Sequence, residues 1–162
     1  MLTSHLEILE QARGYLRSVT EAQYAEVRRP QRSSAGAHMR HIFDHYRALM
    51  TGLETGLIDY DVRQPGQRCE RDPVAALAEA DRIEAWLRHL DLEALGRETR
   101  IRTEISIRQR RVVVVSTTLA RELVFVGSHA VHHFATIGQM AYLQGVQLDP
   151  LFGVAPATAS SL

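Results

Sequence analysis

The segment Leu119–Met140, LARELVFVGSHAVHHFATIGQM, has the clearest pattern in the chain. Its apolar residues recur at three- and four-residue spacing, which is the period of an amphipathic α-helix. The hydroxyl residues at 116–118 can cap the start of this helix, and Gly145 suits the position just after its end. The segment therefore predicts a long helix with one face in a hydrophobic core.

Histidines interrupt the apolar face of this predicted helix. His129 and His133 stand four residues apart, so their side chains share one face. His133 lies on the apolar stripe and His129 within about 40° of it, whereas His132 falls about 100° away, on the flank. Two imidazoles on a buried face must find partners, either neighbouring polar groups or a shared metal ion.

A second run of histidines, His38, His41 and His45, lies in a predicted helix that begins after Ser33-Ser34 and fades near Gly56. The phase of its apolar stripe favours His45 or His38 as the inward residue. Asp44 is either an acceptor that orients an imidazole or a solvated charge. Six of the eight histidines fall in these two runs, which predicts a divalent metal on three imidazoles with one open coordination position.

The remaining patterns complete the predicted fold. Apolar periodicity predicts a helix from Leu2 to Val19, and Asp72-Pro73 is a sharp start for another that continues to Leu90. Two-residue alternation over 101–107 and the valines at 112–115 predict a two-stranded hairpin, whereas 58–71 reads as a loop. We expect an all-α protein: one domain over 1–162, an up-and-down four-helix bundle with a short β-hairpin between helices three and four.

Composition excludes several classes of function. The formal charge is zero, so nothing favours nucleic acid as a partner, and no apolar run approaches the length of a membrane span. With no secretory signal visible, a cytoplasmic location is expected. The chain has no lysine, which excludes Schiff-base chemistry and a P-loop, and Cys69 alone cannot form an intrachain disulfide.

The two histidine segments, SAGAHMRHIFDH over 34–45 and SHAVHHFATI over 128–137, resemble the DinB-like (YfiT/DinB) superfamily. The tail FGVAP over 152–156 is similar to one uncharacterised bacterial branch of it. The resemblance implies a four-helix bundle, often dimeric, with zinc or nickel on three histidines. By motif position these are His41, His129 and His133, and His45 is a fourth ligand or a proton-handling neighbour. Helical phase favours His45 or His38 as the inward residue of this helix, whereas the motif position favours His41, and we follow the motif.

The resemblance implies two classes of function. In the first, a metal-dependent enzyme activates a water or a low-molecular-weight thiol cosubstrate, and hydrolyses a small-molecule substrate or transfers sulfur to it. His45 and His132 are then the candidate catalytic residues. Arg40, Arg47 and Arg121 would hold an anionic substrate or cosubstrate, unless they are ordinary surface arginines. In the second class, the protein is a non-catalytic metal-binding or metal-stabilised interaction module, which a fourth histidine ligand would favour.

Two other enzyme classes fit poorly. A di-iron carboxylate bundle needs glutamates spaced three or four residues from its histidines, and none of the six clustered histidines has one. A hydrolase that used Ser128 and His129 as its catalytic pair would need both side chains on one face of the helix, but adjacent helical residues point to different faces.

We also expect a homodimer. Several apolar residues lie off the main stripe of the last helix, at Val124, Phe125, Phe134 and Tyr142, and the valine run at 112–115 adds to them. A monomer would expose more apolar surface than is usual. The alternative is that loop 58–71 and the C-terminal tail cover this surface.

Overall fold

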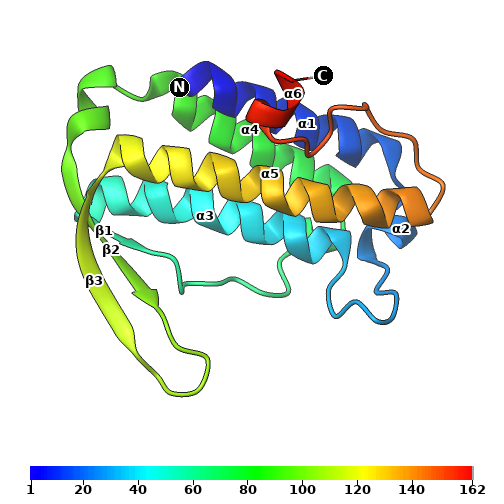
Figure 1. Cartoon of the computed structure of the whole chain (residues 1–162), viewed down its shortest axis with the longest axis horizontal. Helices are drawn as coiled ribbons and strands as arrows, with labels where there is room; N and C mark the ends of the chain where they lie inside the picture. Colours follow the sequence, from blue (N-terminus) through cyan, green and yellow to red (C-terminus); the bar gives the residue numbers. More distant parts are fainter. Residues whose placement is uncertain (162) are drawn as a thin grey trace.

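Four long helices make up most of the structure, a computed structural model that describes residues 1–161. They are α1 (Leu2–Ser18), α3 (Ala35–Thr55), α4 (Pro73–His89) and α5 (Leu119–Leu143). In Figure 1, α3 and α5 lie side by side, with α1 and α4 behind them, and each of these helices packs on two of the others. The structure is therefore mainly helical, as the sequence predicts.

Short elements join the long helices. Helix α2 (Glu21–Ala25) follows α1, and helix α6 (Pro156–Ala159) lies near the C-terminus. Two 3₁₀ turns, Arg68–Glu70 and Leu92–Gly96, flank α4. None of the helices within residues 1–161 has the length and apolar character that a membrane crossing requires.

The predicted helix starts are confirmed by their capping bonds. The side chains of Ser34, Asp72 and Thr118 accept hydrogen bonds from backbone amides in the first turns of α3, α4 and α5. Gly145, two residues past the end of α5, has φ +71°, the left-handed conformation expected after a helix C-terminus. These boundaries follow from local chemistry and so were visible in the sequence.

The core contains large side chains from all four long helices, and five aromatic rings are buried in it: Tyr15, Tyr24, Phe43, Tyr46 and Phe134. The expected stripe of α5 faces this core, since Leu119, Leu123, Val126, Ala130 and Ile137 are all buried. Phe134 was expected off the stripe and exposed, and this is wrong. Its ring stacks on Phe152 of the C-terminal segment, with centroids 5.1 Å apart.

The sheet has three strands, in the order β1-β2-β3. Strands β2 (Glu98–Glu104) and β3 (Val112–Thr118) pair antiparallel, and β1 (Leu57–Asp59) pairs parallel to β2. The predicted first strand was too long, because Ile105 and Ile107 lie in the turn between β2 and β3.

The predicted loop over 58–71 is wrong at two places, since it contains part of β1 and a 3₁₀ turn. Ile58 is fully buried. A Cβ atom on Gly52 would collide with the Ile58 side chain, so glycine in α3 is what allows β1 to pack there. Strand β1 therefore depends on a tertiary contact and not on a periodic sequence pattern.

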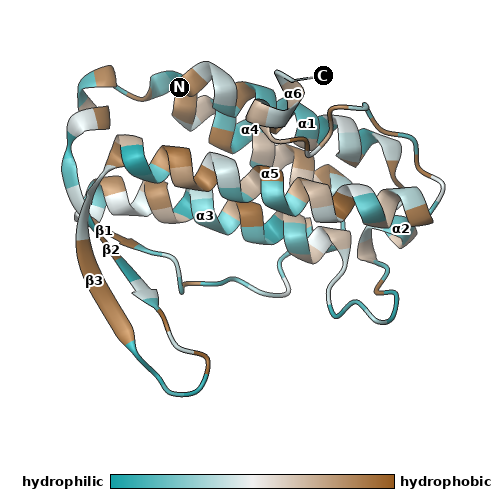
Figure 2. Ribbon diagram, viewed as in Figure 1, coloured by the Kyte–Doolittle hydropathy of each residue, from teal (hydrophilic) through white to brown (hydrophobic). Residues whose placement is uncertain are grey.

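The sheet lies at one end of the helices and leads directly into α5. Strand β3 ends at Thr118, which caps α5, so the ribbon sets where this helix begins. Beyond the helices the β2–β3 ribbon projects outwards (Figure 1). Figure 2 shows hydrophobic colour along β3, where Val114 and Val115 are about half exposed.

The C-terminal segment lies across α1 and α5 (Figure 1). Gly153 donates its backbone N–H to Gln11 Oε1 of α1 at 3.0 Å, and the ring of Phe152 stacks on Tyr15 as well as on Phe134. The C-terminal segment thus covers part of the apolar surface that we expected a second copy of the chain to cover.

Candidate metal centre

Five histidines from α3 and α5 meet where these two helices pack. His38, His41 and His45 share one face of α3 because their spacing is three and then four residues. His129 and His133 share the facing side of α5. His45 is buried, and the other four are half-buried.

Two nitrogen–nitrogen separations in this cluster are close to those of a metal site. Nε2 of His129 is 3.1 Å from Nε2 of His41 and 3.1 Å from Nε2 of His133. In a tetrahedral zinc site with Zn–N bonds of about 2.0–2.1 Å, neighbouring nitrogens are about 3.3 Å apart. A single Nε2 has one proton or one lone pair, so it cannot make good hydrogen bonds to both neighbours. Lone pairs directed at a shared cation account for both short separations better.

His45 belongs to an overlapping group. One ligand atom from each of His41, His45 and His129 can be chosen so that all lie within 4.8 Å of one another. Nδ1 of His45 is 3.0 Å from the backbone oxygen of His41, so Nδ1–H donates to this carbonyl. The neutral ring then has an unprotonated Nε2, the form that a metal ligand needs. The two groups share His41 and His129 and differ in the third member.

His38 lies behind His133. Their Nδ1 atoms are 2.9 Å apart. When Nδ1–H of His133 donates to His38, Nε2 of His133 keeps its lone pair free on the side of His129. Ligating histidines usually donate their other N–H to such a partner, which fixes the ring orientation. Helical phase had identified His38 as facing inward, but its pairing with His133 was not predicted.

The imidazoles of the cluster are neutral at pH 7. Burial, followed by the charges of neighbouring histidines, lowers the pKa of His41 and of His133 to about 3 and the pKa of His129 to about 4. Burial also lowers the pKa of His45 and of His38. Neutral rings have the lone pairs that a divalent cation requires.

Two aromatic rings flank the histidines. Tyr60 stacks on His45 with centroids 5.0 Å apart, and Phe125 stacks on His129 at 5.6 Å. The Tyr60 hydroxyl donates to Glu122 Oε2 at 2.7 Å, and Glu122 is fully buried. Tyr60 follows β1, within the segment expected to be a loop, so no periodic pattern could have placed it here.

One hypothesis was that Asp44 orients an imidazole by accepting a hydrogen bond from it, but Asp44 makes no such bond within residues 1–161. Its carboxylate accepts from Arg40 at 2.6 Å and from Arg47 at 2.8 Å. Arg47 also donates to Glu79 at 2.8 Å. Arg40 lies 3.4 Å from Glu70, so both arginines, predicted to bind an anionic substrate, lie in ion pairs that connect α3 to its neighbours.

The other cations near the site differ in their surroundings. Arg121 is exposed, pairs with Glu122 at 2.8 Å and lies over the Phe125 ring at 5.5 Å. Arg63 was not singled out in the sequence. Its positive charge, after the larger effect of burial, lowers the pKa of both His41 and His45, so it lies near the cluster. Within residues 1–161 no carboxylate forms an ion pair with Arg63.

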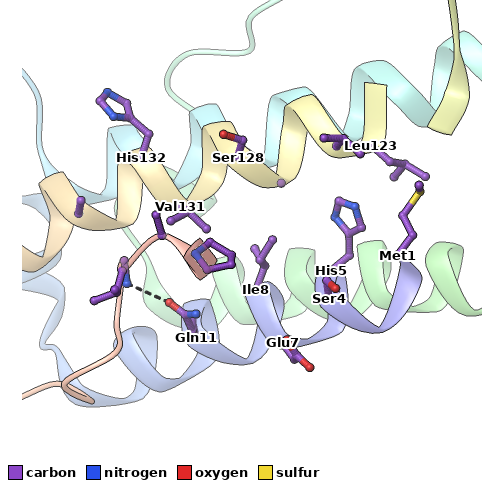
Figure 3. Close-up of a pocket in the computed structure, with 17 residues that line it drawn as sticks. Met1, Ser4, His5, Glu7, Ile8, Gln11, Leu123, Ser128, Val131 and His132 are labelled. Carbon is purple, nitrogen blue, oxygen red and sulfur yellow. Dashed lines mark hydrogen bonds between the residues drawn. The ribbon is translucent and has the colours of Figure 1, made fainter. Parts of the chain in front are cut away.

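His132, the second predicted catalytic residue, lies at the margin of the cluster. It is exposed, and its ring centroid is 5.7 Å from that of His133. Figure 3 shows that its side chain extends to the side of α5 away from α1. The structure brings His45 among the clustered nitrogens and leaves His132 outside them.

The chain matches a known protein family. The family model described as the DinB superfamily matches residues 7–137, about four fifths of the sequence, and the matched range includes both histidine runs. No curated protein and no solved structure matches.

Proposed function

The chain belongs to the DinB superfamily, and from that premise we propose that it binds one divalent metal ion through His41, His129 and His133. The long helices serve as an up-and-down four-helix scaffold for this site. The observation that carries the proposal is the pair of 3.1 Å separations between the three Nε2 atoms. Zinc or nickel suits neutral imidazole ligands.

We propose that the site is catalytic. A divalent ion held by three histidines lowers the pKa of a bound water or thiol towards neutrality, which makes a nucleophile available for hydrolysis or S-transfer. His45 lies beside the ligands and can hold a proton at Nε2. Arg63 has the free cationic charge that would orient an anionic substrate or thiol cosubstrate. Tyr60 and Phe125 provide apolar walls against a small organic substrate.

A non-catalytic metal-binding module is the second candidate. It is favoured by His45, whose Nδ1 is held by the His41 carbonyl at 3.0 Å, so that Nε2 is free to act as a fourth ligand. Four protein ligands would close the site and leave it structural. Turnover of a thiol with an electrophile, or of a simple ester or amide, separates the two candidates.

Metal content tests the proposal directly. Tag-free protein should contain about one zinc or nickel ion per chain by elemental analysis, and His129→Ala and His133→Ala should each lose most of it. His89→Ala is the control, because His89 is exposed on α4 and, among residues 1–161, its ring bonds only to its own helix backbone. Added zinc should raise the melting temperature, since binding to the native state stabilises it. Metal-free protein with no response to zinc would disprove the proposal.

We also propose a homodimer. Its support is the apolar edge strand β3, where Val114 and Val115 are exposed, together with Val124 of α5, which is 59% exposed. A free strand edge can pair with the same edge of a second copy about a two-fold axis.

A further inference from the structure

A cavity lies on the other side of α5 from the histidine cluster. It has a volume of about 750 Å³ and opens between α1, α5 and residues 153–156 of the C-terminal segment. Its lining is mostly apolar and includes Ile8, Leu123, Val124, Val131 and Val154. Both the volume and the apolar lining are typical of small-molecule sites.

Six polar residues also line the cavity: Ser4, His5, Glu7, Gln11, Ser128 and His132. Of these, His5 is the buried one. His5 of α1 is only 3% exposed, and Figure 3 shows its ring reaching from α1 towards α5, between Ile8 and Met1. A Cβ atom on Gly127 of α5 would lie 3.2 Å from His5 Cε1, so glycine leaves the space that the ring occupies.

The protonation of His5 follows from its buried partner. Nδ1 of His5 is 2.9 Å from the hydroxyl oxygen of Tyr46, a residue with no exposed surface. Burial raises the pKa of Tyr46, so the hydroxyl keeps its proton. Nδ1 of His5 is the one partner of this hydroxyl in the described chain. A buried O–H without an acceptor is costly, so the hydroxyl donates to Nδ1.

The other ring nitrogen of His5 is therefore a donor. A neutral imidazole whose Nδ1 accepts must have its proton on Nε2. Nε2 has no hydrogen-bond partner among residues 1–161, and it is not among the fully enclosed polar atoms that lack one. His5 thus supplies a fixed N–H donor within a lining that is mostly apolar.

We propose that this cavity binds a small apolar organic molecule with one acceptor oxygen, a carbonyl or carboxylate, which accepts a hydrogen bond from His5 Nε2. The site is separate from the metal centre and does not depend on a bound ion. The apolar body of the ligand would contact Ile8, Leu123 and Val131.

A matched pair of probes tests the proposal on the full chain. 4-Phenylbutan-2-one and n-butylbenzene share a carbon skeleton, but only the ketone has an acceptor. We expect the ketone to bind about fivefold more tightly, which is the usual worth of one hydrogen bond. In His5→Phe the difference should disappear. Equal affinities in the unsubstituted protein, or no saturable binding of either probe, would overturn the proposal.

Two further measurements do not depend on the stability of His5→Phe. The ¹⁵N shifts of the His5 ring should report a proton on Nε2, and Nε2 should shift on titration with the ketone. A proton on Nδ1 instead would refute the donor assignment. Ile8→Trp should fill the cavity and abolish binding, while Val74→Trp, at an exposed site on α4, should leave it unchanged. Binding that survives Ile8→Trp would place the probe elsewhere and overturn the assignment.

Discussion

At the scale of single residues, the histidines of the metal centre should differ in importance. His41 and His129 occur in both possible ligand sets, so His41→Ala should abolish tight metal binding, whereas His45→Ala should weaken it or alter activity. Competition with a chromogenic chelator would measure both affinities. If His45→Ala removed the metal and His41→Ala retained it, helical phase would have been a better guide than motif position.

His5 should make stability depend on pH. Burial lowers its pKa from 6.5 to about 4, so between these values the unfolded chain binds a proton that the folded chain does not. The stability due to neutral His5 is complete above pH 6.5 and is lost as the pH falls towards 4. Denaturant unfolding with a chelator present should show that His5→Phe loses about 2 kcal/mol less than the unsubstituted protein between pH 7 and pH 5. Parallel pH profiles would contradict this expectation.

Much of the candidate site could be predicted from residue spacing alone. Helical periodicity puts His129 and His133 on one face, and their Nε2 atoms lie 3.1 Å apart in the structure. The surroundings could not be predicted in the same way. Tyr60 reaches the cluster from a segment without periodicity. Arg40 and Arg47 pair with Asp44 of their own helix, but their further partners, Glu70 and Glu79, lie far away in sequence.

At the scale of elements, the packing of α3 depends on small residues. A Cβ atom on Gly36 would collide with the backbone carbonyl of Glu70, so Gly36→Ala should lower the free energy of unfolding by about 1–3 kcal/mol. Gly14→Ala is the matched control, because nothing lies within 4 Å of its Cβ position in α1. There alanine should stabilise the helix by about 0.5–1 kcal/mol. Urea titrations of both variants would measure the contrast, and similar effects would contradict it.

The sequence predicted elements correctly where local hydrogen bonds determine their boundaries. Capping side chains at Ser34, Asp72 and Thr118 fix helix starts whatever the rest of the chain does. Strand β1 was missed because three residues contain no period, and its stability comes from pairing with β2 and from the space beside Gly52.

At the scale of the whole molecule, the assembly state remains a prediction. Light scattering at micromolar concentration should give the mass of two chains. Val114→Glu with Val115→Glu should shift that mass towards one chain, because like charges on the two β3 edges repel each other. A mass of one chain that does not change with concentration would exclude the dimer.

The sequence analysis overestimated the exposed apolar surface, because the C-terminal segment has no periodic pattern from which its packing on α1 and α5 could be predicted. Phe152 packs on Phe134 and Tyr15, and Phe125 stacks on His129, so both phenylalanines of α5 have partners within the chain. The Phe152 contacts join residues far apart in sequence, which periodicity cannot relate. Tyr142 of α5 is 82% exposed, as expected.

The position of the histidines on two different helices has a topological consequence. An ion on His41 and His129 would tie together two points 88 residues apart in the chain. Closing a loop of that length removes conformational entropy from the unfolded state worth about 4–5 kcal/mol, by the reasoning used for disulfides. With Cys69 as its single cysteine, this chain can form no intrachain disulfide. The metal would act as its cross-link, one that a chelator can open and an added ion can close again.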